Sequence, residues 1–176
     1  MSKKKKRRQD IQHAMIDINQ NWTLSVCDGE LYESQEWVYY YDKEDNKFLF
    51  FRDLSDEERE QIKSLIGTRY IMLFKYIAEI QYKSLLELLD NKAVTAWFNT
   101  SDSEEDKYGK YYKFLDWNSL YGDEKYRLYK HIAPMFIDWC EKNDLKYKFI
   151  ELSPPEDYLY SDLKKLKSHT WQIPRW

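Results

Sequence analysis

The chain has 176 residues, of which 43% are hydrophobic and 18% aromatic, and it contains only 4 glycines and 4 prolines. This length suits one hydrophobic core, and the apolar content excludes an intrinsically disordered protein. The net charge is −3, but the basic run Lys3–Arg8 supplies six positive charges, so the rest of the chain carries −9. We therefore expect a disordered basic tail at residues 1–8 and a single acidic domain at residues 9–176.

The two cysteines, Cys27 and Cys140, are far apart and lack the spacing of metal ligands. No secretory apolar segment follows the basic start of the chain. These features predict a cytoplasmic protein without a disulfide framework.

The first half of the chain predicts a short helix, three strands and two further helices. The helix covers roughly residues 9–20, and the strands are Trp22–Val26, Trp37–Tyr41 and Lys47–Phe51, of which the last two form a hairpin. Ser55 and Glu58 form a capping box that starts a helix ending near Gly67. The next stretch, Arg69–Leu89, predicts a long buried helix with one charged stripe, made of Lys75, Glu79, Lys83 and Glu87.

The second half predicts two strands, a helix, a strand and a last helix. The strands Ala93–Phe98 and Tyr108–Trp117 flank an acidic loop at residues 100–107. A helix begins at Asp123 and kinks or restarts at Pro134. Lys146–Leu152 is the final strand, and Glu156–Lys167 the final helix.

This order of elements favours an α+β fold. We expect a mostly antiparallel sheet of about five to six strands, packed by four to five helices in a single domain. The longest apolar stretch carries four charges in its interior, which makes insertion into a membrane unfavourable.

A search for chemistry finds no catalytic motif. The three histidines stand alone, the four glycines are dispersed, and no phosphate-binding loop is present. We therefore expect neither cofactor nor bound metal, and no enzyme activity. A set of carboxylates would be needed for a metal-dependent nuclease, but their spacing favours solvated turns and helix starts; they are Asp42, Glu44, Asp45, Asp116, Asp123 and Glu124.

Two regions are the candidate surface for a protein partner. In the hairpin both faces carry apolar side chains, so one face is left for a helix, a second subunit or a partner. The acidic loop adds negative charge that attracts a basic partner. The candidate partner-binding residues are Trp37, Tyr39, Tyr40, Tyr41, Asp102, Glu104, Glu105 and Asp106.

The sequence thus favours a non-catalytic binding protein that blocks or neutralises a macromolecular partner, in the manner of an inhibitor, a toxin-immunity protein or a phage counter-defence protein. A nucleic-acid-associated accessory protein is the alternative, and a metal-dependent nuclease is the second alternative. For the accessory protein, the polyanion-binding residues are Lys3, Lys4, Lys5, Lys6, Arg7 and Arg8.

Overall fold

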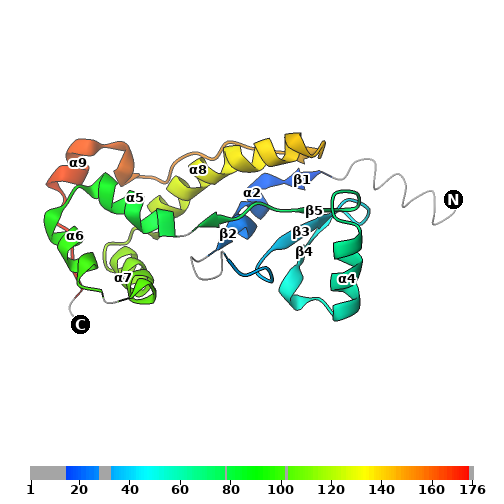
Figure 1. The fold of residues 1–176 in the computed structure, drawn as a ribbon. Helices are drawn as coiled ribbons and strands as arrows, with labels where there is room; N and C mark the ends of the chain where they lie inside the picture. The colour runs from blue at the N-terminus through cyan, green and yellow to red at the C-terminus, as the bar shows by residue number, and fades with distance from the viewer. Residues whose placement is uncertain (1–14, 28–32, 78, 102, 175–176) are drawn as a thin grey trace. The chain divides into compact units, whose positions relative to one another are not determined.

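The computed structural model describes residues 15–27, 33–77, 79–101 and 103–174, and Figure 1 labels its helices and strands. The chain divides into two compact units, each built from two stretches of sequence. Unit 1 contains Met1–Ile77 and Ile132–Glu151, and unit 2 contains Ala78–His131 and Leu152–Trp176. The basic run Lys3–Arg8 lies outside the described residues.

Unit 1 contains every described strand together with short helices. Its elements in chain order are β1 (Ile16–Asp17), α2 (Ile18–Asn21), η1 (Trp22–Ser25), β2 (Val26–Cys27), β3 (Tyr39–Asp42), β4 (Lys47–Phe50), η2 (Phe51–Asp53), α4 (Asp56–Ser64), β5 (Tyr70–Met72), β6 (Tyr76–Ile77), the end of α8 (Tyr121–Lys142) and β7 (Tyr147–Lys148). Unit 2 is helical in its described part. It contains α5 (Glu79–Leu89), α6 (Lys92–Asn99), α7 (Glu104–Trp117), the start of α8, η3 (Leu159–Ser161) and α9 (Leu163–Ser168).

The predicted fold class is wrong. Of the described residues, 54% are helical and only 13% are in strands. The strands form two parallel pairs, β1–β7 and β2–β6, and one antiparallel sheet in the order β4-β3-β5. A mostly antiparallel sheet of five to six strands is therefore absent from the described part of the chain.

Two predicted strands are α-helices, and a third, Trp22–Val26, is mostly the 3-10 helix η1. Asn91 caps α6 by accepting hydrogen bonds from the backbone N–H groups of Ala93 and Val94, at 3.0 and 3.1 Å. Val94 and Phe98, four residues apart, are both buried, as helical periodicity requires. In α7, Tyr111, Phe114 and Leu115 are buried at the same kind of spacing. Aromatic and β-branched side chains suggested strands here, but burial of one helical face outweighs that preference.

The predicted helix at Arg69–Leu89 is also wrong over its first half. This stretch contains β5 and β6 before α5 begins at Glu79. β5 is held by pairing with β3, in the register Tyr40↔Met72 and Tyr41↔Ile71. These partners lie some 30 residues earlier in the chain, so helical spacing within the stretch does not reveal the pairing.

Three local predictions are confirmed, namely the hairpin, the capping box and the long helix predicted to begin at Asp123. Tyr39↔Phe50, Tyr41↔Phe48 and Asp42↔Lys47 pair in the β3–β4 hairpin. Ser55 accepts from the backbone N–H of Glu58 at 3.3 Å, and the Glu58 carboxylate accepts from that of Ser55 at 2.8 Å. α8 runs from Tyr121 to Lys142 with Pro134 inside it, so the helix is not ended there.

Helices cover both faces of the three-stranded sheet. On one face, Val38, Tyr40, Phe51 and Tyr70 form a buried cluster with Ile62 of α4, which Figure 1 shows beside the sheet. On the other face, the Phe48 ring lies 6.1 Å from the Phe136 ring and 6.2 Å from the Trp139 ring, both from α8. The α8 contact covers only the end of this face that carries Phe48 and Tyr41, since Tyr41 also meets Trp139.

The core of unit 2 surrounds a charged network. Tyr82, Leu85, Phe98, Phe114 and Leu166 belong to its buried cluster. Glu124, only 2% exposed, accepts from the Tyr111 hydroxyl at 2.5 Å and from Arg127 at 2.5 and 2.9 Å. Arg127 also donates to Ser84 Oγ at 2.6 Å. These hydrogen bonds give the buried carboxylate of Glu124 partners at both of its oxygens.

Candidate functional site

The hairpin of unit 1 carries a ladder of aromatic rings on one face. Strand pairing places Tyr39 opposite Phe50, and their rings stack with centroids 4.8 Å apart. Trp37 extends the ladder by meeting the edge of Phe50 at 5.4 Å. Trp37, Tyr39 and Phe50 are all half-buried, whereas Tyr41 on the same face is only 5% exposed. The solvent-accessible end of the ladder is therefore the Trp37 end.

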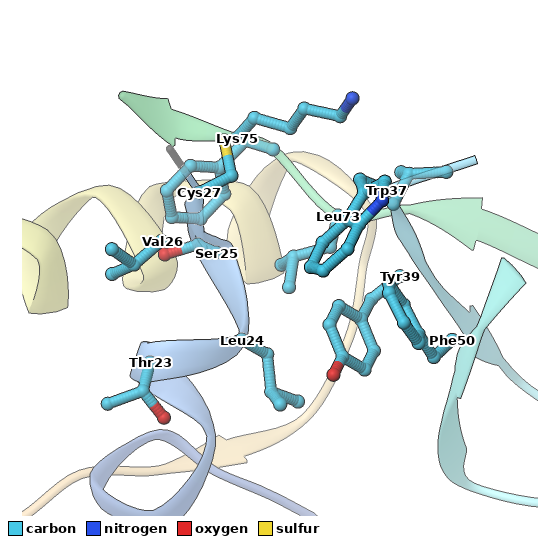
Figure 2. A pocket seen from close by; sticks show the side chains of 12 residues that line it. Thr23, Leu24, Ser25, Val26, Cys27, Trp37, Tyr39, Phe50, Leu73 and Lys75 are labelled. Carbon is cyan, nitrogen blue, oxygen red and sulfur yellow. The ribbon is translucent and has the colours of Figure 1, made fainter. Parts of the chain in front are cut away.

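A cavity of about 320 Å³ lies at this end. Figure 2 shows Trp37, Tyr39 and Phe50 along one side of it, with Leu24 and Leu73 close by. Its other walls come from residues 23–27, which form η1 and β2, and from residues 73–75, which join β5 to β6. The cavity is thus built by four separate stretches of unit 1. The parallel β2–β6 pair joins two of them, and the β3–β4 hairpin joins the other two.

Three polar side chains of the cavity wall donate hydrogen bonds to backbone carbonyls. Lys75 Nζ donates to the Ser34 carbonyl at 2.6 Å, and Ser25 Oγ donates to that of Trp22 at 2.8 Å. The Cys27 thiol donates to the carbonyl of Tyr76 at 3.6 Å. Apart from these groups, the lining is mostly aromatic and aliphatic side chains, which form the binding surface of the cavity.

A second hollow, of about 670 Å³, lies against the opposite face of the hairpin. Tyr40 and Phe51 line it together with Met72 and Ile66. Met72 is 54% exposed and Ile66 is 50% exposed, although both are large apolar side chains. Both faces of the hairpin therefore border a hollow that apolar side chains line at least in part.

The predicted site residues fall into different surroundings. Trp37 and Tyr39 line the first cavity, whereas Tyr40 and Tyr41 are buried in the packing of the sheet. The acidic residues belong to unit 2, where Ser103 caps α7 by accepting from the N–H of Asp106 at 3.1 Å. Asp106 is exposed, and the predicted loop is in part the first turn of α7, where negative charge stabilises a helix. The structure describes neither Asp102 nor the side chains of Glu104 and Glu105.

Arg69 changes the electrostatics of the hairpin turn. Its guanidinium contacts three carboxylates: Asp42 at 2.7 Å, Glu44 at 2.7 Å and Asp45 at 3.5 Å. Burial opposes the ionisation of Asp42, but hydrogen bonds from Arg69 and from the N–H groups of Asp45 and Glu44 outweigh it, and the pKa of Asp42 is lowered. The turn is therefore far less negative than its sequence suggests. Arg69 lies 27 residues beyond Asp42, and no local pattern links the two.

The described residues contain no metal centre, and the chain matches no known protein with which it was compared. Within the described ranges, no three His, Cys, Asp or Glu side chains form a group that could hold a metal ion. Among the helices of those ranges, none has both the length and the apolar character needed to span a bilayer. Comparisons with protein-family models, curated proteins and solved structures found no match to this chain.

Proposed function

We propose that the chain is a non-catalytic binding protein that blocks or neutralises a protein partner, and that the Trp37 end of the hairpin is its contact surface. The observation that carries this proposal is the half-exposed ladder of Trp37, Tyr39 and Phe50 beside a 320 Å³ cavity. Tryptophan and tyrosine dominate the energetics of protein interfaces because they bury much apolar area with few rotatable bonds. A neighbouring cavity accepts an anchor side chain from the partner.

Charge supports a basic partner. The chain outside Lys3–Arg8 carries a net charge of −9, which speeds the encounter with a positively charged protein. Because Arg69 neutralises much of the hairpin turn, we assign anchoring to the aromatic residues and steering to the remaining acidic surface, including Asp106. Steering of this kind raises the association rate and weakens with added salt.

We also propose a cytoplasmic location. Cys27 and Cys140 form no disulfide in the structure, as suits a reducing compartment.

The test is an affinity measurement on a matched pair of tryptophan variants. The intact protein serves as bait in an extract of its source cells, and the recovered protein is then titrated against purified variants. Trp37→Ala should weaken binding by about tenfold or more, because it removes the aromatic side chain at the accessible end of the ladder. Trp117→Ala is the control, since Trp117 is 50% exposed but belongs to unit 2.

Circular dichroism and a melting curve establish that both variants are folded. Equal affinity of Trp37→Ala and wild type for the recovered protein would rule out this contact surface.

A further inference from the structure

β4 is an edge strand whose outward backbone groups can be identified. The sheet order β4-β3-β5 leaves one side of β4 without a neighbouring strand, and Figure 1 shows β4 at the border of the sheet. The N–H of Phe51 donates to the carbonyl of Val38 at 3.0 Å. Since antiparallel pairing alternates along a strand, Leu49 and Lys47 also bond to β3, and the N–H and C=O groups of Phe48 and Phe50 point outward.

The opposite edge of the sheet, at β5, is closed by the chain itself. There the outward residues are Tyr70 and Met72, because Leu73 donates to the Tyr39 carbonyl at 2.8 Å. The Tyr70 carbonyl accepts from Gly67 at 2.9 Å, and the Tyr70 N–H donates to Leu65 at 3.2 Å. The indole N–H of Trp139 donates a hydrogen bond to the Met72 carbonyl at 2.9 Å.

Among the described residues, nothing closes the outward edge of β4 in this way. Within the described part of the chain, no residue hydrogen-bonds to the backbone of Phe48 or Phe50 on the outward side. A row of alternating N–H and C=O groups at strand spacing is complementary to one kind of ligand, an extended polypeptide.

We infer that β4 accepts an extended segment of the partner protein as a fourth strand of the sheet. This inference rests on the proposed function and specifies how the partner is held. Hydrogen bonds to Phe48 and Phe50 fix the backbone of the segment, whatever its sequence.

The adjoining cavity selects the side chain of that segment. A residue directly opposite Phe50 lies on the same face of the sheet as Phe50 and Tyr39. These two rings line the 320 Å³ cavity, so this residue of the segment is apolar. Main-chain bonds thus supply affinity while the cavity supplies specificity.

The first test measures amide hydrogen exchange by NMR, residue by residue, in the full-length protein. In the free protein the amides of Phe48 and Phe50 exchange fast, whereas those of Leu49 and Phe51 are protected by β3. The probes are capped linear peptides of about 12 residues selected on the intact protein from a displayed random library. Bound peptide should slow exchange at Phe48 and Phe50 by about tenfold or more and leave Leu49 unchanged.

A second test uses a pair of variants that differ in one backbone donor. The φ angle of Phe50 is −84°, close to that of proline, and its N–H makes no bond to β3. Phe50→Pro and Phe50→Leu both lose the ring, but only Phe50→Pro loses the outward N–H. Phe50→Pro should bind the selected peptides about tenfold more weakly than Phe50→Leu, and equal affinities would overturn the inference. If Phe50→Pro does not fold, the exchange measurement on wild type decides alone.

Three other results also overturn strand addition. They are selected peptides that bind without slowing exchange at Phe48 and Phe50, a library from which no peptide binds, and protection of these amides that rises with protein concentration alone. The last result identifies a second copy of the chain as the occupant. None of them affects the proposed function, which fails only if Trp37→Ala binds the recovered partner like wild type.

Discussion

Arg69 donates two hydrogen bonds to the buried carboxylate of Asp42, from Nε at 3.0 Å and from Nη2 at 2.7 Å. The Asp42 side chain is 2% exposed and the Arg69 side chain 22% exposed. The pair joins the end of β3 to the residue that precedes β5. Arg69→Met should lower the free energy of unfolding by about 3–5 kcal/mol, because it leaves a buried carboxylate without its counter-ion. Denaturant titration at pH 7 measures this loss, and Lys63→Met, which breaks an exposed pair, is the control with little effect.

The same pair predicts a pH dependence. The pKa of Asp42 is lower in the folded chain than the ordinary 3.8, so its stabilising effect is present above pH 3.8 and is lost as the pH falls through the folded value. Asp42→Asn should therefore flatten the decrease in stability below about pH 4. Melting temperatures measured for wild type and Asp42→Asn from pH 7 to pH 2 check this, and parallel curves would contradict it.

Buried tyrosines predict a loss of stability at high pH. Burial first, and then the negative charge of Glu124, raise the pKa values of Tyr111 and Tyr160 in the folded protein above the ordinary 10.0. Their contribution to stability is therefore present below pH 10 and is lost as the pH rises, because only the unfolded chain can ionise them. Phenolate absorbance should show tyrosines that titrate only on unfolding. In Tyr111→Phe the number of such tyrosines should fall by one.

The two cysteines should differ in reactivity. Burial, with a smaller effect of Glu141, raises the pKa of Cys140 to about 12, and its side chain is fully buried. Cys27 is half-buried at the cavity wall. At pH 8 a thiol-reactive disulfide reagent should modify Cys27 within the native protein and Cys140 only after denaturation. Cys27→Ser should then show no native reactivity, and rapid modification of that variant would place Cys140 nearer the surface.

Helix α5 offers a comparison of adjacent leucines. Leu85 is 0% exposed in the core of unit 2, whereas Leu86 is only half-buried against it. Leu85→Ala should cost about 2–5 kcal/mol and Leu86→Ala distinctly less. Equal costs in denaturant titrations would mean that the helix is rotated about its axis. The same titrations show whether the single domain expected from the sequence unfolds in one transition or the two units unfold separately.

Local chemistry decided which elements could be predicted from sequence. The Ser55–Glu58 capping box and the hairpin around Asn46 depend on residues a few positions apart, and both are present. Asn46 supports the turn with a φ of 52°, which asparagine tolerates better than most residues. The prediction of strands at α6 and α7 was wrong because Val94, Phe98 and Tyr111 are compatible with either a strand or a helix. Only their packing in the fold distinguishes the two.

The candidate site was harder to predict than the capping box or the hairpin, because its form depends on residues far apart in the sequence. The sequence predicted the aromatic hairpin as the contact surface but did not indicate which end of it is accessible, because the burial of Tyr41 depends on Trp139 nearly 100 residues later. The cavity needs the parallel pairing of Val26 with Tyr76, which alternation along either strand cannot reveal. The charge of the hairpin turn likewise depends on Arg69, which pairs with Asp42 but lies 27 residues later in the sequence.

The interleaving of the two units along the chain has a consequence for synthesis on the ribosome. Asn19 exchanges hydrogen bonds with Ile150 across 131 residues, and β1 pairs with β7 in the same region. Unit 1 therefore cannot close until its last stretch has been translated, and by then most of the segment assigned to unit 2 has left the exit tunnel. Unit 2 in turn awaits Tyr160 and Leu166 for its core. A nascent chain stalled after His131 would hold both units unfinished at once, with their apolar surfaces open to chaperones.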